Sequence, residues 1–169
     1  TDVNEVRLSI DGGKTWVKAT QSATKGVWDY TWLSDVGEGK HTLTVEATDA
    51  AGNKTTQTLD FTIDTTLSEP TIALDDTNDS GTKGDNLTNA NKPTFILGNI
   101  DADARYVTVE VQHGSTKEVL TATKGTNGVW SVIPTGTWAD GSYTLTVRVE
   151  DNAENVKYSA PLTVTVDTH

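Results

Sequence analysis

Apolar and polar residues alternate with a period of two along several short segments of the chain. The clearest segments are rich in Val, Thr and Leu, and they span residues 41–47, 59–64, 106–112, 143–150 and 162–167. Such alternation is typical of strands with one buried face, and β-branched residues favour strands. Turns such as Asp11-Gly12-Gly13 and Asp140-Gly141 separate the segments, and no stretch keeps helical apolar spacing over three turns. The pattern predicts an all-β protein.

The sequence also repeats itself. GVWDY at 26–30 matches GVWSV at 128–132, and residues 39–53 match 141–155, both at an offset of 102. FTIDTT at 61–66 matches VTVDTH at 164–169 at an offset of 103, so we expect one inserted residue between Asn155 and Leu162. Self-similarity of this kind indicates two copies of one structural unit.

The two copies differ in how many strands they contain. Residues 66–169 contain seven predicted strands, which start near Pro70, Pro93, Tyr106, Glu118, Gly128, Ser142 and Leu162. Seven short strands in roughly 100 residues favour an immunoglobulin-like sandwich. Residues 1–65 show counterparts of only the last five. We therefore expect tandem immunoglobulin-like antiparallel β-sandwiches, end to end, the first truncated and with an open edge. That first sandwich should be less well ordered, or completed by other residues or by a neighbouring molecule.

Composition narrows the possible partners. The formal net charge of −11 disfavours binding to nucleic acid and to anionic membrane surfaces. There is no cysteine, hence no disulfide and no thiolate metal site. No apolar run approaches the roughly 20 residues of a transmembrane helix, so we expect no membrane insertion. The abrupt first and last residues suggest a piece of a longer chain.

An acidic loop is predicted between the first two strands of the second unit. It spans residues 74–89 and carries the carboxylates of Asp75, Asp76, Asp79 and Asp85. Calcium takes six to eight oxygen ligands, several of them carboxylates. The spacing does not fit an EF-hand. The loop is therefore either a calcium site or a solvated acidic loop.

Other carboxylates are expected at the ends of the sandwiches. In an immunoglobulin-like topology the acidic loop, Asp140 and Asp167 lie at one end of the second unit. A second group is expected at the junction of the two units: Asp64, Asp101, Asp103 and Asp151. Clustered carboxylates repel one another unless a cation neutralises them, although each of these residues also suits a turn.

The residues offer little for catalysis. His41, His113 and His169 are scattered, and neither a Ser-His-Asp arrangement nor a phosphate-binding glycine loop is evident. We expect no enzyme.

The alternative function is a glycan-binding module that uses exposed tryptophans, because indole faces stack on sugar rings. Trp28 and Trp130 occupy repeated positions and suit the core. Trp16 and Trp138 fall in turns or at strand ends, where partial exposure would make them candidate ligand contacts.

One motif suggests a glycosidase when it is considered alone. SIDGGKTW at 9–16 fits the Asp-box pattern known from sialidases and other β-propeller glycosidases. A propeller would repeat the box in several blades, whereas the equivalent segment 110–119 has none. We interpret the box as one way to build a hairpin, with Trp16 folded back onto the sandwich.

Taken together, LDDTNDSGTKGDNLTN, KPTF, GVW, DGSYTLTV and VDT resemble the bacterial Ig-like repeats of giant type I-secreted adhesins. The resemblance covers the second unit and extends over the first from Val6, where DAAGN and IDTT occur. It implies a calcium-binding stalk module of a secreted surface adhesin, with neighbouring repeats as partners and host-cell glycans as targets of the full-length protein. It also implies calcium ligands at Asp75, Asp79 and Asp85, with Asp140 or Asp167 nearby and a similar role for Asp64. The second unit has DNAEN in place of DAAGN, which leaves the conformation of that loop open.

Overall fold

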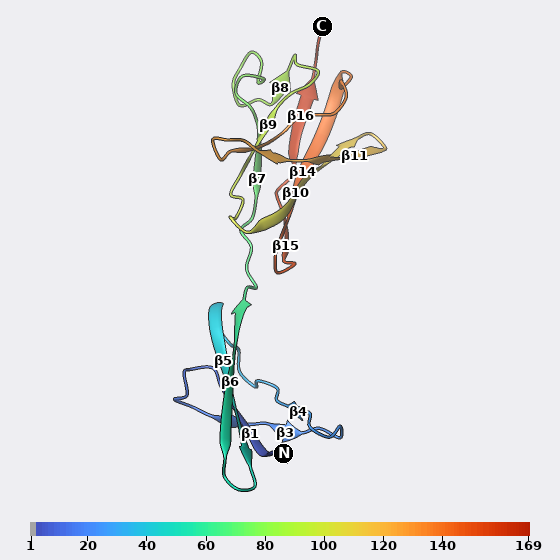
Figure 1. The fold of residues 1–169 in the computed structure, drawn as a ribbon. Coiled ribbons are helices and arrows are strands. Elements are labelled where there is room, and N and C mark those ends of the chain that lie inside the picture. The colour runs from blue at the N-terminus through green and yellow to red at the C-terminus, as the bar shows by residue number, and fades with distance from the viewer. Residues whose placement is uncertain (1–2) are drawn as a thin grey trace. The chain divides into compact units, whose positions relative to one another are not determined.

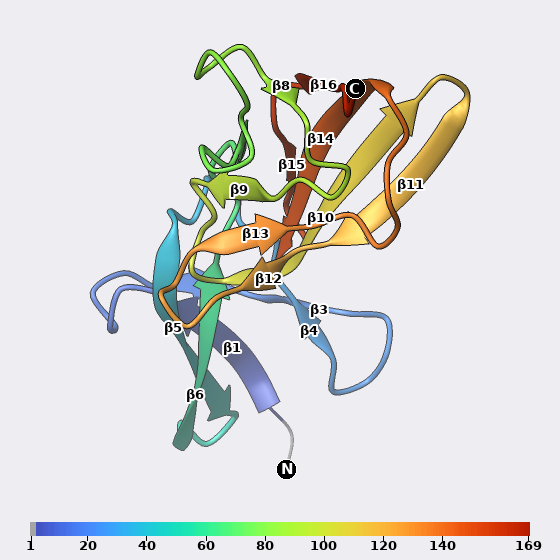
Figure 2. The same cartoon turned by 90° about the horizontal axis from the view of Figure 1, so that it is seen from above.

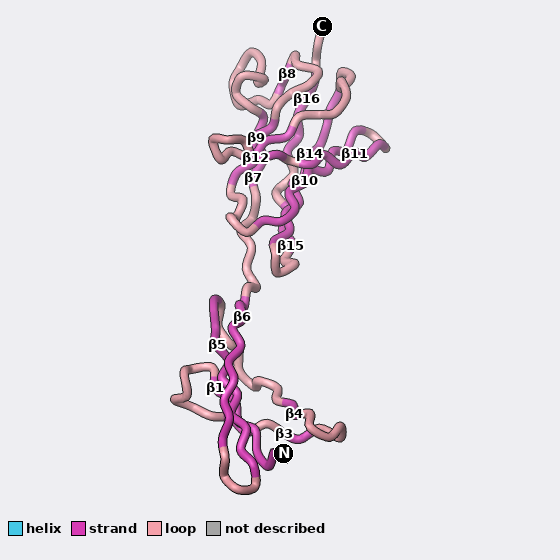
Figure 3. Tube along the Cα trace, in the orientation of Figure 1, coloured by secondary structure: helices cyan, strands magenta, loops and turns pink. Residues whose placement is uncertain are grey.

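The computed structural model describes residues 3–169, which form strands and loops and no helix (Figure 3). The described residues accordingly include no helix long and apolar enough to cross a membrane. The chain divides into two compact units, unit 1 up to Thr65 and unit 2 from Thr66 to His169. The predicted all-β class is confirmed.

Unit 1 contains a four-stranded antiparallel sheet in the order β2-β1-β5-β6 and a separate two-stranded sheet, β3-β4 (Figure 1). Its strands are β1 (Val3–Ser9), β2 (Val17–Lys18), β3 (Thr20–Gln21), β4 (Trp28–Asp29), β5 (Gly39–Asp49) and β6 (Lys54–Ile63). Only Val6 and Ala19 are buried apolar side chains among the described residues of this unit. The described residues of unit 1 therefore supply one large sheet and little to cover it.

Unit 2 is a complete two-sheet sandwich (Figure 2). One sheet has the order β11-β10-β14-β16-β8, with β15 also pairing β14, and the other has the order β12-β13-β9-β7. The strands are β7 (Thr71–Leu74), β8 (Leu87–Thr88), β9 (Phe95–Gly98), β10 (Ala104–His113), β11 (Thr116–Thr121), β12 (Thr123–Lys124), β13 (Trp130–Val132), β14 (Gly141–Asp151), β15 (Val156–Tyr158) and β16 (Leu162–Val166). The seven predicted strands are all present.

The core of unit 2 lies between its two sheets. Alternate residues of β14 point into it, and Leu145, Val147 and Val149 are at most 1% exposed. Phe95 and Leu97 of β9 meet them from the other sheet at 0% and 3% exposure. The period-two pattern of the sequence therefore marks the buried face correctly.

The predicted insertion lies at a break between β15 and β16. In unit 1, β5 and β6 pair without interruption from Gly39↔Ile63 to Thr48↔Lys54. In unit 2, β14 pairs with β15 up to Arg148↔Tyr158 and resumes with β16 at Leu145↔Leu162. The backbone amide and hydroxyl of Ser159 bridge the gap through bonds to Val147. Pro161, which has no N–H to donate, falls inside the break.

The Asp-box segment is a hairpin between β1 and β2, as expected. The carboxylate of Asp11 accepts bonds from the Thr15 amide at 2.9 Å, the Thr15 hydroxyl at 2.6 Å and the Ser9 hydroxyl at 2.8 Å. These bonds, led by the Thr15 hydroxyl, hold the pKa of Asp11 far below its usual range. The Trp16 indole folds back and donates to the Gly13 carbonyl at 3.0 Å. The box therefore organises its own turn.

Candidate metal centre

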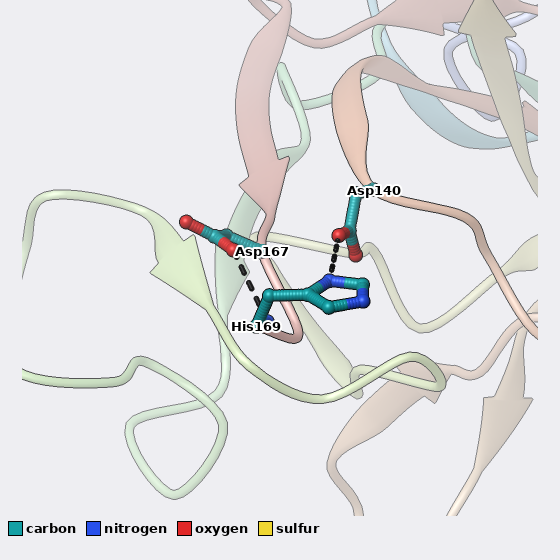
Figure 4. A group of neighbouring side chains, drawn as sticks. All are labelled: Asp140, Asp167 and His169. Atoms are coloured by element: carbon teal, nitrogen blue, oxygen red, sulfur yellow. Dashed lines mark hydrogen bonds and ion pairs between the residues drawn. The ribbon is translucent and has the colours of Figure 1, made fainter.

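Three side chains gather at the end of unit 2 that follows β16 (Figure 4). Asp140 precedes β14, and Asp167 and His169 follow β16; one ligand atom from each lies within 4.8 Å of the other two. His169 Nδ1 is 2.6 Å from Asp140 Oδ2, and the His169 amide donates to Asp167 Oδ1 at 3.3 Å. All three residues are exposed.

Asp140 also holds the segment that follows β16. Its Oδ1 accepts the Thr168 amide at 3.0 Å and the Thr168 hydroxyl at 2.8 Å. The Thr168 hydroxyl first and His169 second lower the pKa of Asp140. Unit 1 has the same arrangement, in which the Glu38 carboxylate accepts the Thr65 amide at 3.1 Å and the Thr65 hydroxyl. We call these two pairs, Glu38–Thr65 and Asp140–Thr168, the exit clamps.

The acidic loop of unit 2 reaches the same end as Asp167. Its last part forms β8, which pairs in parallel with β16 through Thr165↔Leu87 and Val166↔Thr88. The Asp167 amide donates to the Thr88 carbonyl at 2.9 Å. This pairing is a long-range contact that the local pattern of the sequence did not predict.

Within the loop, most carboxylates bind nearby backbone amides. Asp75 accepts the Thr77 amide at 2.8 Å and the Thr77 hydroxyl, and the hydroxyl contributes most to lowering the pKa of Asp75. Asp85 accepts the Leu87 amide at 3.0 Å. Among the described residues, the carboxylates of Asp75, Asp76, Asp79 and Asp85 do not converge on one point as those at the exit do.

Asp79 differs from the other carboxylates of the loop. It is 4% exposed, and its Oδ2 accepts the Gly84 amide at 2.5 Å. Its Oδ1 is buried without a hydrogen-bond partner. An unpaired buried carboxylate oxygen is costly, so this atom suits a cation. The Lys83 ammonium already lies in the loop, where it donates to the Asp76 carbonyl at 2.6 Å and to the Asp79 carbonyl.

The opposite end of unit 2 holds Asp101, Asp103 and Asp151. Asp101 accepts the Ser68 amide at 2.6 Å and hydroxyl at 2.7 Å. A carboxylate oxygen of Asp103 lies within 4.8 Å of one of Asp151. Asp151 is fully buried, and although burial raises its pKa, bonds from Asn155 and the Ala153 amide outweigh that effect and lower it. Asp64 directly follows β6 in unit 1.

The chemistry of these donors fits calcium in part. Calcium prefers oxygen ligands, which Asp140, Asp167 and Asp79 supply. The imidazole of His169 is instead a ligand typical of zinc, copper or nickel. Two exposed carboxylates fall short of six oxygens, so backbone carbonyls or water would have to supply the rest.

All five tryptophans are buried or half-buried. Trp138 is 7% exposed, its ring stacked on Tyr143 at 4.1 Å between centroids, so the expected partial exposure of Trp138 is wrong. The reason is a tertiary contact between the loop before β14 and the strand itself. Trp16 is half-buried, with the Arg7 guanidinium 5.2 Å above its ring.

Both units match a known protein family. A family model described as bacterial Ig-like domain matches residues 1–65 and again 66–168. No curated protein matches the sequence.

Several solved structures resemble it. One is a tetra-tandem repeat from the extending region of a large adhesion protein, with 21% identity, TM-score 0.46, and coverage of 99% of this chain and 44% of that one. A second is the set of fibronectin(III)-like modules of Clostridium thermocellum CbhA, with 16% identity, TM-score 0.45, and coverage of 98% of this chain and 78% of that one. A third is a Ca²⁺-stabilized adhesin of an ice-binding Antarctic bacterium, with 23% identity, TM-score 0.44, and coverage of 100% of this chain and 41% of that one. The chain thus spans less than half the length of the two adhesin structures.

Proposed function

The chain belongs to the bacterial Ig-like domain family along both of its units, and from this premise we propose that it is a structural repeat of a secreted bacterial surface adhesin. In this proposal the two units form part of a non-enzymatic stalk, with further repeats of the same kind as neighbours. Calcium at the ends of the units stiffens the stalk, and the full-length adhesin makes the contact with a host cell or another surface.

The exit clamps carry the proposal. Glu38 and Asp140 each bind the amide and hydroxyl of the threonine that follows the last strand of their unit. A carboxylate at the equivalent position therefore binds the equivalent threonine in both copies. A stalk needs each unit to control the segment that leads out of it, because a loose segment would let neighbouring units swing.

The proposed calcium ligands are the carboxylates near the exit clamps. Asp140 and Asp167 lie close together at the exit of unit 2, and the end of the loop carrying Asp75, Asp76, Asp79 and Asp85 pairs with β16 nearby. A bound cation would relieve their mutual repulsion. We extend the proposal to Asp101, Asp103 and Asp151 at the opposite end of unit 2 and, from its place in the sequence alone, to Asp64.

Such binding would couple calcium to folding. An ion that binds only the folded state stabilises it in proportion to the logarithm of its concentration. A chain exported unfolded through a type I route would then fold on meeting extracellular calcium. No observation favours the glycan-binding alternative over this function.

The test is thermal unfolding of the whole chain in about 1 mM calcium, within the range of weak extracellular sites, and in EDTA. We expect calcium to raise the melting temperature. The shift should shrink in the double variant Asp140→Asn with Asp167→Asn, and in Asp79→Asn, and should persist in the control Asp29→Asn, which changes an exposed carboxylate of β4. Equal melting temperatures in calcium and EDTA would refute the calcium part of the proposal.

A further inference from the structure

The acidic loop of unit 2 contains one positively charged side chain. Residues 74–89 carry the ammonium of Lys83 against four carboxylates, those of Asp75, Asp76, Asp79 and Asp85. Lys83 Nζ donates to the Asp76 carbonyl at 2.6 Å and to the Asp79 carbonyl. Two backbone carbonyl oxygens therefore converge on one cationic atom.

The partners of this ammonium are of a kind that a metal ion also takes. No ion pair joins Lys83 to a carboxylate among residues 3–169. Its ammonium instead binds backbone carbonyl oxygens, which calcium uses as ligands together with carboxylates. Lys83 thus occupies two oxygen ligands that a calcium ion could use.

Asp79 offers a further ligand that the ammonium leaves unused. Its backbone carbonyl accepts a bond from Lys83, but its side-chain Oδ1 is buried without a hydrogen-bond partner in a residue that is 4% exposed. A buried carboxylate oxygen without a partner is costly. A calcium ion takes six to eight oxygens, so it can use this atom and the backbone carbonyls together, which the three donors of one ammonium do not achieve here.

The backbone around Lys83 is held by bonds that do not involve its side chain. The Gly84 amide donates to Asp79 Oδ2 at 2.5 Å, and the Ser80 amide donates to the Leu87 carbonyl at 2.8 Å. Lys83 itself is an exposed residue. Its side chain can therefore turn out into water while these backbone bonds keep the shape of the loop.

We propose that Lys83 is an intramolecular competitor for calcium in this loop, an inference that rests on the calcium part of the proposed function. Without calcium, the ammonium binds the two carbonyls and offsets part of the negative charge around it. A calcium ion takes the carbonyls of Asp76 and Asp79 together with Asp79 Oδ1, and the ammonium moves into solvent. Lys83 therefore raises the calcium concentration at which unit 2 responds, because the two cations repel one another and share ligands.

The first experiment measures calcium binding to the whole chain by isothermal titration calorimetry. Lys83→Gln removes the ammonium, and the control Lys157→Gln removes the same charge from an exposed position on β15. We expect Lys83→Gln to bind calcium at least about fivefold more tightly than the control, because a like charge beside the ion is gone. Adding Asp79→Asn to Lys83→Gln should abolish this gain, which assigns it to the loop. In EDTA, Lys83→Gln should melt at a lower temperature than the control.

The second experiment measures the displacement of the ammonium itself. An amine-specific acetylating reagent, with mass spectrometry of the digested chain, reports how freely each lysine reacts. Calcium should raise the acetylation rate of Lys83 and leave that of Lys157 unchanged, because only the Lys83 ammonium leaves a hydrogen-bonded position.

The outcomes separate this proposal from the calcium part of the proposed function. Calcium binding that is equal or weaker in Lys83→Gln than in the control would overturn the competition and leave calcium binding intact. Acetylation of Lys83 that calcium slows or does not change would do the same. Binding by Lys83→Gln but not by the unchanged chain would support the competition and refute calcium binding by the natural loop. No binding by any of these chains would overturn both.

Discussion

Asp151 holds Asn155 with both of its carboxylate oxygens, Oδ1 accepting the backbone amide at 2.9 Å and Oδ2 accepting the side-chain amide at 2.8 Å. The Ala153 amide adds a third bond at 2.8 Å, and the carboxylate is fully buried. Asp49 makes the same three bonds with Ala51 and Asn53 in unit 1. The turn after the longest strand is therefore built in the same way in both units.

This pair of aspartates gives the first prediction. Asp151→Ala should destabilise unit 2 by about 3 kcal/mol or more, because three donors lose their acceptor in a buried site. Asp49→Ala should cost unit 1 less, since its turn is more exposed and water can replace the carboxylate. Hydrogen exchange of the amides of β14 and β5 measures the loss of stability in each unit separately. Equal losses in the two units would contradict the proposed role of burial.

The same turn gives the second prediction. Glu154 has φ of 69°, where its counterpart Gly52 has φ of 85°. A residue with a side chain pays about 1 kcal/mol in this left-handed region. Glu154→Gly should therefore stabilise unit 2 by about that amount, while Gly52→Ala should destabilise unit 1. Denaturant titration gives the sign of the change in the free energy of unfolding. A loss of stability in Glu154→Gly would show that the backbone at Glu154 is not strained.

The buried aromatic stack gives the third prediction. Trp138 packs between Tyr143 and Phe95, with ring centroids 4.1 Å and 5.7 Å away. Trp138→Ala should cost unit 2 about 3–5 kcal/mol, as large-to-small changes in a core do. Trp16→Ala, which removes a half-buried ring from the Asp-box hairpin, should leave the exchange rates of β14 unchanged. A small effect of Trp138→Ala would mean that the site collapses around the missing ring.

The lowered pKa values of three aspartates give the fourth prediction, which concerns stability at low pH. The pKa values of Asp11, Asp75 and Asp140 are all lowered, in each case chiefly by a threonine hydroxyl. A lowered carboxyl pKa contributes stability above the unfolded value of about 3.9, and that stability is lost as the pH falls through the folded value. The melting temperature should therefore change little between about pH 7 and 5 and fall below about pH 4.

Calorimetry across this range checks the acid prediction. Asp140→Asn should make the fall shallower for unit 2, because one of the titrating groups is removed. A melting temperature that stays constant down to about pH 3 would contradict the linkage.

Much of the fold followed from local patterns. The alternation in 143–150 marks the buried side of β14 because a strand has a strict period of two, and the repeat located the insertion that the structure has beside Pro161. The pairing of β8 with β16 did not follow, since two residues, Leu87 and Thr88, give no periodicity. The burial of Trp138 did not follow either, because it depends on Tyr143, which lies five residues along in sequence but packs against Trp138 only after folding.

The candidate site was less predictable than the fold. Sequence could mark Asp140 and Asp167 as acidic residues at one end, but the contact with His169 depends on where the last residues turn. The unpartnered oxygen of Asp79 and the position of the Lys83 ammonium depend on side-chain geometry within a loop. A threonine after each last strand was visible as IDTT and VDTH, and this could have pointed to the exit clamps.

The pairing of β16 on both sides has a mechanical consequence. β16 is bonded along its length to β14 and, at its outgoing end, to β8. Tension applied at residue 169 pulls β16 along its own axis, so these hydrogen bonds are loaded together in shear and cannot be peeled open one at a time. Unit 2 is thus built to hold under a pulling load directed through its last strand.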